Sequence, residues 1–188
     1  MVFLHGIGAS LNYFGRNVPF FARSMRAIAL DTPGFGASDA PDVTYTVPWM
    51  AGRIARFLEL KGVGPATLVG NSMGGAASIG VALDHPEMVE RLVLMGSAGL
   101  PIPEKPSPDL MKNLQYDFTL DGMRRVVSGL TGPDYVPPEE MIQYRYEIVD
   151  GPEARAALAA INAQTRTGTL NYPEERLATI KQDRKSVA

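Results

Sequence analysis

The chain has 188 residues, 45% of them hydrophobic, so it can bury the core of one domain with an inserted subdomain. Its net charge of −2 argues against a nucleic-acid partner. It has no cysteine and two histidines, so we expect no disulfide, no thiol nucleophile and no metal site. No apolar run reaches the roughly 18–20 residues of a membrane span, and the N-terminus does not resemble a signal peptide. We therefore expect a cytoplasmic protein with no membrane partner and no cofactor.

The first half of the chain alternates short apolar runs with helical patterns. Strands are predicted at 1–4, 26–30, 66–70 and 90–95, and helices at 11–25, 46–60 and 72–84. Pro19 should bend or interrupt the first helix, and Thr46 can cap the second. Because the strands are apolar on both faces, the pattern predicts an α/β fold, a parallel sheet of about four strands covered by helices.

The character of the chain changes at Gly99. Residues 100–109 hold four prolines and are not expected to form regular structure. The remainder predicts helices and no strand, with helices near 108–115, 120–130, 138–149, 152–165 and 174–182. Such a block would lie over the strand ends, where open α/β sheets bind ligands. We therefore divide the chain into a partial core at 1–99, an all-helical cap at 100–173 and a return to the core at 174–188.

Residues 68–75 read LVGNSMGG, which is G-x-S-x-G between a predicted strand and a predicted helix. A strand that turns sharply into a helix strains the backbone of the turn residue, and glycines two positions away leave room for the turn. Ser72 would stand at the tip, at the positive end of the helix. A glycine-rich connector with an unreactive serine is the alternative, but strand, motif and helix occur in the required order. Ser72 is therefore the candidate nucleophile.

A serine nucleophile needs a general base and an oxyanion hole. The Met73 amide, at the helix N-terminus, can supply one oxyanion donor. The loop at 5–10, HGIGAS, follows the first strand, and its Ile7 amide is placed to supply the second. Gly6 and Gly8 would give this loop its backbone shape, and we count both among the candidate substrate-binding residues. A plain turn at the strand exit is the alternative for the loop.

The motifs VFLHGIGAS, ALDTPGFGASD, LVGNSMGG and HPEMVERLVLMG together resemble the α/β-hydrolase family, over about residues 1–96. Within that family, GNSMGG, MGSAGL and the helical cap are similar to the meta-cleavage product hydrolases. Those enzymes cut a carbon–carbon bond in vinylogous 1,5-diketone acids from aromatic ring fission. The resemblance implies a hydrolase of aromatic catabolism whose partner is a small-molecule substrate.

The same resemblance implies which residues bind the substrate. Arg145, in QYRYEIV, matches a cap arginine that holds anionic oxygens of the substrate, a task suited to a planar donor fork that is always charged. Asn71, just before the nucleophile, also binds substrate in that family. A surface helix position is the alternative for Arg145. Asn12 is left out, because its register against a family asparagine is off by one.

The family order, nucleophile then acid then histidine, is not completed in this chain. His85 lies thirteen residues after Ser72, roughly 20 Å along the same helix, and should end that helix. His5 is expected to be structural in the glycine loop. For Asp31 and Asp39 we expect turn capping rather than catalysis.

The residues at 181–188, KQDRKSVA, are predicted to be too polar and too short for a buried strand. We therefore expect an incomplete hydrolase that lacks the acid–base half and the two strands that normally precede HGxG. Both sheet edges would then be open and apolar, which favours pairing with another chain and a homo-oligomer.

Two classes of function follow. The preferred one is a serine hydrolase that cleaves a carbon–carbon bond in a meta-cleavage dienoate, with a carboxylic ester as the alternative substrate because the same elbow serves esterases. The other class is a catalytically incompetent fragment, or a binding protein on a hydrolase scaffold. The missing base predicts that the 188-residue polypeptide is nearly inactive alone.

Overall fold

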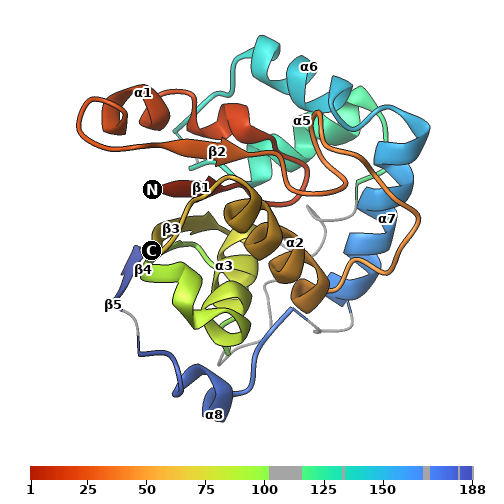
Figure 1. The fold of residues 1–188 in the computed structure, drawn as a ribbon. Coiled ribbons are helices and arrows are strands. Elements are labelled where there is room, and N and C mark those ends of the chain that lie inside the picture. The colour runs from red at the N-terminus through yellow and green to blue at the C-terminus, as the bar shows by residue number, and fades with distance from the viewer. Residues whose placement is uncertain (102–115, 133, 167–169, 182, 188) are drawn as a thin grey trace.

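The fold is known from a computed structural model, which describes residues 1–101, 116–132, 134–166, 170–181 and 183–187. Its centre is a five-stranded sheet in the order β2-β1-β3-β4-β5, with every neighbouring pair parallel (Figure 1). The predicted α/β fold with a parallel sheet is confirmed. The strands are β1 Val2–Leu4, β2 Ile28–Leu30, β3 Ala66–Asn71, β4 Val89–Met95 and β5 Asp183–Val187.

The fifth strand corrects the sequence prediction. β5 pairs with β4 in parallel, with Asp183 opposite Arg91 and Val187 opposite Met95. The expectation that no strand follows Gly99, because the last residues are too polar, is therefore wrong. That argument considered side-chain polarity alone, whereas the ladder that joins β5 to β4 is made by backbone groups, which polar residues also carry. The edge of β4 is therefore covered, and the strand that covers it is polar rather than apolar.

One face of the sheet is covered by two helices, α2 (Val47–Leu60) and α3 (Met73–Asp84) (Figure 1). α2 begins where the sequence predicts, because the Thr46 hydroxyl accepts a hydrogen bond from the Trp49 N–H at 3.2 Å. Its buried stripe, Met50, Ala51, Ile54, Ala55 and Leu58, joins β1 and β3 in the larger apolar core. α3 is buried along most of its length, so the helix that follows Ser72 is anchored in that core.

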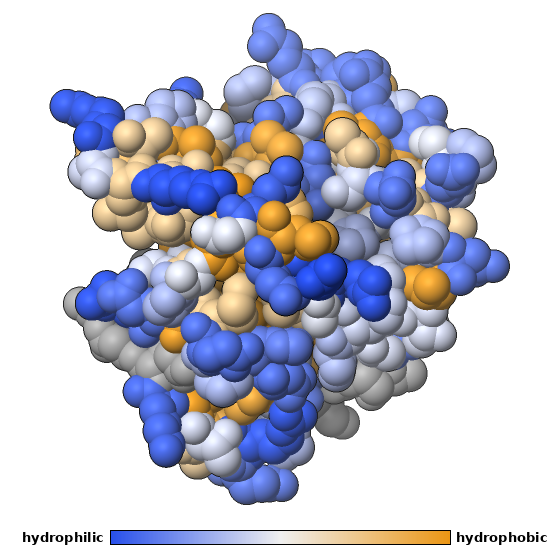
Figure 2. Space-filling view, in the orientation of Figure 1, coloured by the Kyte–Doolittle hydropathy of each residue, from blue (hydrophilic) through white to orange (hydrophobic). Residues whose placement is uncertain are grey.

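The other face of the sheet carries the N-terminal segment. The helix expected at 11–25 is two short elements, the 3-10 helix η1 (Leu11–Phe14) and α1 (Asn17–Phe21). The break lies before Pro19, because a proline ring clashes with the carbonyl four residues earlier, here that of Gly15. Phe3, Phe14 and Val69 form a second, smaller core beneath these elements. Apolar side chains also gather on the surface around α1 (Figure 2), where Phe20 is 62% exposed.

The first helices after β4 in the described chain are α5 (Leu120–Gly129), α6 (Glu139–Glu147) and α7 (Pro152–Arg166). We call them the cap helices, and they lie together at the upper right of Figure 1. The helices expected at 120–130, 138–149 and 152–165 are thus present, while the one expected at 108–115 lies outside the described residues. The helix expected at 174–182 is shorter: α8 (Glu174–Leu177) ends five residues earlier and packs against α3. The domain boundaries at 99 and 173 stay predictions.

Candidate active site

Ser72 occupies the predicted sharp turn between β3 and α3. Its φ of 51° and ψ of −119° lie in a region that L-residues rarely adopt, at a cost on the order of 1–3 kcal/mol. The flanking glycines allow the turn, because a Cβ on Gly70 would lie 2.5 Å from the Gly74 carbonyl oxygen, and one on Gly74 would overlap the Leu4 carbonyl oxygen. The strained elbow that the motif predicts is therefore present.

Backbone hydrogen bonds fix this elbow to the end of β4. The Ser72 N–H donates to the Met95 carbonyl at 3.1 Å, and the Ser72 carbonyl accepts from the Ala98 N–H at 3.1 Å. The Ser72 side chain is partly exposed, and among the described residues its hydroxyl has no hydrogen-bond partner. The Ser72 backbone is therefore fixed, while its hydroxyl is not bonded to any other described residue.

The glycine loop, residues 5–10, lies directly against the elbow. A Cβ on Gly6 would be 3.0 Å from the Ser72 Cβ, so the loop could not approach this closely with a larger residue. Within the described parts of the chain, neither the Ile7 N–H nor the Met73 N–H donates a hydrogen bond to another residue. The structure thus leaves both predicted oxyanion donors unpaired on the two segments that meet at Ser72.

Asn71 lies in the same contact. Its amide nitrogen donates to the Met95 carbonyl at 3.1 Å, and its Oδ1 would be 3.1 Å from a Cβ on Gly6. The side chain therefore spans the ends of β3 and β4, with its N–H already bonded to the chain. Its predicted substrate-binding role stays a prediction.

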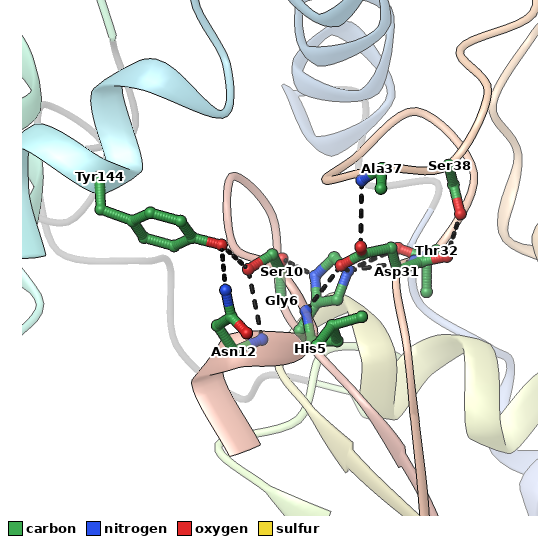
Figure 3. Close-up of polar contacts among 10 residues, drawn as sticks. His5, Gly6, Ser10, Asn12, Asp31, Thr32, Ala37, Ser38 and Tyr144 are labelled. Carbon is green, nitrogen blue, oxygen red and sulfur yellow. Dashed lines mark hydrogen bonds and ion pairs between the residues drawn. The ribbon is translucent and has the colours of Figure 1, made fainter. Parts of the chain in front are cut away.

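His5 is a structural residue of the loop (Figure 3). Its Nδ1 donates to the Gly6 carbonyl at 2.8 Å, and its Nε2 accepts from the Thr32 N–H at 3.1 Å, which fixes the neutral tautomer. Burial lowers the pKa of His5 below its ordinary value, outweighing Asp31, whose carboxylate oxygen is 4.0 Å from Nε2. Both ring nitrogens are thus engaged within the fold, and the ring is not placed to accept a proton from Ser72.

The loop after β2 holds the glycine loop from the other side. The Asp31 carboxylate accepts the Leu11 N–H at 2.7 Å and the Ala37 N–H at 3.0 Å (Figure 3). A Cβ on Gly36 would collide with this carboxylate. Asp31 therefore caps turns, as expected, and joins the segment after β1 to the loop after β2.

The second histidine is remote from the elbow. His85 caps the far end of α3, where its N–H donates to the Val81 carbonyl at 2.8 Å. The helix between Ser72 and His85 spans ~18 Å at 1.5 Å per residue. The expected role of His85 in ending the helix is confirmed.

Arg145 reaches the glycine loop from α6. Its Nε and one terminal nitrogen both donate to the Gly8 carbonyl, at 3.3 and 3.1 Å. Gly8 has a φ of 64°, a conformation that favours glycine and presents this carbonyl to the cap helix. Burial lowers the pKa of the guanidinium, which still stays charged at neutral pH. Among the described residues Arg145 has no carboxylate partner.

The sequence prediction missed three residues at this junction. The Tyr144 hydroxyl lies 2.7 Å from the Ser10 hydroxyl and accepts from the Asn12 amide at 2.6 Å (Figure 3). Ser10 also accepts the Asn12 N–H at the start of η1, a cap that its residue type and position could have suggested. Nothing in the sequence pairs these residues with Tyr144, which is more than 130 positions away.

The described residues contain neither a metal site nor a membrane-spanning helix. No group of three or more His, Asp or Glu side chains is arranged to hold a metal ion in those ranges. Across the same ranges, the helices are too short or too polar to cross a membrane.

Comparison with known proteins places this geometry in a family. The family model described as the alpha/beta hydrolase fold matches residues 1–143, which include the glycine loop, the elbow and part of α6. The chain belongs to the alpha/beta hydrolase fold family.

Two relatives are named as hydrolases, one of a hexa-2,4-dienoic acid and one of 2-hydroxymuconate semialdehyde. The chain is 39% identical to 2-hydroxy-6-oxo-6-(2'-aminophenyl)hexa-2,4-dienoic acid hydrolase of Metapseudomonas resinovorans, over 96% of this chain and 63% of the relative. It is 32% identical to 2-hydroxymuconate semialdehyde hydrolase of Pseudomonas sp. strain CF600, over 86% of this chain and 58% of the relative. The chain thus spans less than two thirds of the length of these relatives.

Solved structures agree with the fold. 2-Hydroxy-6-oxo-6-phenylhexa-2,4-dienoate hydrolase from Rhodococcus sp. strain RHA1 superimposes with a TM-score of 0.85 at 28% identity, covering 98% of this chain and 70% of that one. A serine hydrolase involved in carbazole degradation superimposes with a TM-score of 0.84 at 34% identity, covering 98% of this chain and 69% of that one.

Proposed function

We propose that this alpha/beta hydrolase chain provides the nucleophile, the oxyanion hole and the substrate-binding cap of a serine hydrolase. Its substrate would be a meta-cleavage dienoate, in which the enzyme hydrolyses a carbon–carbon bond. The observation that carries this proposal is Arg145, a partly buried cation with no carboxylate partner among the described residues, held against the loop that touches Ser72. An anionic substrate would supply the missing charge. The names of the relatives support the same substrate class.

The chemistry follows from the positions of these groups. The Ser72 oxygen attacks the substrate ketone while its proton passes to a general base, and the carbonyl oxygen becomes an oxyanion. The unpaired amides of Ile7 and Met73 would stabilise that charge, and such donors are worth about 10²–10³ in rate. The carbon–carbon bond then breaks, its electrons pass to the conjugated acid, which takes up a proton, and water hydrolyses the acyl-serine.

Neither histidine of the chain serves as the general base in this scheme. His5 has both ring nitrogens engaged and His85 lies at the far end of α3, so neither histidine can take the proton of Ser72. The coding DNA beyond Ala188 tests this directly. An open reading frame that continues with an Asp and a Gly-His would supply the acid and the base. An in-frame stop codon would instead favour the catalytically incompetent chain or binding protein.

The substrate is tested with the complete product of the reading frame that encodes this chain. A ring-fission dienoate and a neutral p-nitrophenyl ester are compared for the wild type, Ser72→Ala and Arg145→Ala. We expect Ser72→Ala to abolish turnover of both substrates. We expect Arg145→Ala to lower kcat/KM for the dienoate by about 10–100-fold, the worth of a hydrogen bond to a charged group, and to affect the ester much less.

The matched control is Arg23→Ala, which removes an exposed arginine beyond α1 and should leave both activities within twofold. Faster turnover of the ester than of the dienoate, with no effect of Arg145→Ala, would overturn the carbon–carbon assignment and favour the carboxylic-ester hydrolase.

The remaining expectations from the sequence also stay proposals. Substrate binding by Asn71, Gly6 and Gly8 is tested by KM in single variants. Limited proteolysis tests whether the helical cap is a separate domain. Cell fractionation tests the cytoplasmic location, and light scattering tests the homo-oligomer.

A further inference from the structure

The contact between α6 and the glycine loop has a second component beside Arg145. Tyr144, the preceding residue, places its hydroxyl between Ser10 and Asn12, at the point where the loop ends and η1 begins (Figure 3). Ser10 is 3% exposed and is therefore buried under this contact. The Tyr144 ring comes from the cap helix, whereas both of its hydrogen-bond partners belong to the core.

The direction of these hydrogen bonds follows from the groups involved. The Asn12 amide nitrogen can only donate, so at 2.6 Å the Tyr144 oxygen accepts from it. The phenolic proton is then free to point at the Ser10 hydroxyl, 2.7 Å away. Ser10 also accepts the Asn12 backbone N–H, which starts η1. One hydroxyl on the cap thus completes a small network that sets the C-terminal end of the glycine loop.

Two contacts from consecutive residues restrain α6 more than one contact would. Neighbouring helical residues project about 100° apart around the axis, because a turn holds 3.6 residues. Arg145 alone, bonded to the Gly8 carbonyl, would leave the helix able to roll about that point. Adding Tyr144 at Ser10 and Asn12 fixes both the rotation of α6 and the two ends of the segment from Gly8 to Asn12.

We propose that Tyr144 is a positioning residue. Its hydroxyl locks α6 onto the glycine loop and so holds the Ile7 amide and the Arg145 guanidinium in place relative to Ser72. The proposal deepens the proposed function and rests on it for its catalytic consequence. Tyr144 does not touch the reacting atoms in this scheme. Its effect is transmitted through a loop that is packed against Ser72 at Gly6.

The test uses Tyr144→Phe in the complete reading-frame product, because this change removes the hydroxyl and keeps the ring. The matched control is Tyr135→Phe, the same change at a tyrosine that is 53% exposed between α5 and α6. Hydrogen exchange of the amides at residues 7–12 is measured by mass spectrometry, and kcat and KM are measured for the dienoate and the p-nitrophenyl ester. Exchange requires no turnover, so it tests the lock even if neither substrate is hydrolysed.

We expect Tyr144→Phe to speed exchange at residues 7–12 at least fivefold and to lower kcat for both substrates about five- to tenfold, the usual worth of one hydrogen bond. Ser10→Ala breaks the same network from the core side and covers the case in which Tyr144→Phe fails to fold. The double variant should be no worse than the more affected single variant.

Exchange equal to that of Tyr135→Phe would overturn the lock, and faster exchange with unchanged kcat would overturn the positioning role. Failure of the wild type on both substrates would overturn the proposed function alone.

Discussion

At the scale of single residues, Ser72 stores strain that a substitution can release. Its φ of 51° with ψ of −119° is a conformation that glycine adopts much more readily than residues with a Cβ. We expect Ser72→Gly to raise the free energy of unfolding by about 1 kcal/mol relative to Ser72→Ala, since both lack the hydroxyl and only glycine relaxes the backbone. Urea unfolding measures the difference. The control compares Arg53→Gly with Arg53→Ala on the exposed side of α2, where the glycine variant should be the less stable one. A difference in unfolding free energy of the same sign at both sites would contradict the strain.

His5 makes the stability of the glycine loop depend on pH. Burial lowers its folded pKa, with Arg145 lowering it and Asp31 raising it, so the unfolded chain binds a proton near pH 6.5 that the folded chain refuses. Stability is therefore full above pH 6.5 and falls as the pH drops below it, by up to about 1.4 kcal/mol per pH unit. Unfolding of the wild type and His5→Gln between pH 5 and 8 checks this. A slope that persists in the variant would assign the effect to another group.

At the scale of elements, local patterns were sufficient to predict the elbow but not the contacts of the cap. The strand, the glycines and the helix around Ser72 are adjacent in sequence, and the steric reason for their order is local. The pairing of Tyr144 with Ser10 and Asn12 joins distant segments, and no periodicity or motif encodes it. The same reasoning applies to β5, because its pairing with β4 joins segments that are distant in sequence through backbone groups.

The crossing of α3 over β1 offers a test of this close packing. Gly74 lies where a Cβ would overlap the Leu4 carbonyl oxygen, and a backbone atom cannot move aside as a side chain can. We expect Gly74→Ala to lower the free energy of unfolding by about 2–3 kcal/mol or more, despite the better helix propensity of alanine. Gly52→Ala in α2 is the matched control, because no atom lies within 4 Å of its Cβ position, and it should raise stability by about 0.5–1 kcal/mol. Equal effects at both glycines would contradict the packing argument.

At the scale of the whole molecule, the sequence predicts a parallel sheet covered by helices better than it predicts the number of strands in that sheet. Apolar strands alternating with helices specify a parallel sheet, because such strands must be covered on both faces. The position of the cap helices over the glycine loop follows from that topology, since the loops after parallel strands meet at one edge. The number of strands depends on tertiary contacts and differs from the prediction. The break in the first helix follows from the ring of Pro19 and agrees with the prediction that this residue bends or interrupts the helix.

Whether Ser72 can react also depends on where the fold places the two histidines. Its hydroxyl has no hydrogen-bond partner among the described residues, His5 is bonded on both sides, and α3 holds His85 at its far end. Removing the histidine of a serine triad costs on the order of 10⁶ in turnover. We therefore expect the polypeptide of residues 1–188, purified alone, to hydrolyse p-nitrophenyl acetate at a rate within tenfold of its own Ser72→Ala variant. Circular dichroism of both proteins establishes that they are equally folded. Turnover that exceeds the variant by a hundredfold or more would show that a base within these residues reaches Ser72, and His5 would then be the first residue to substitute.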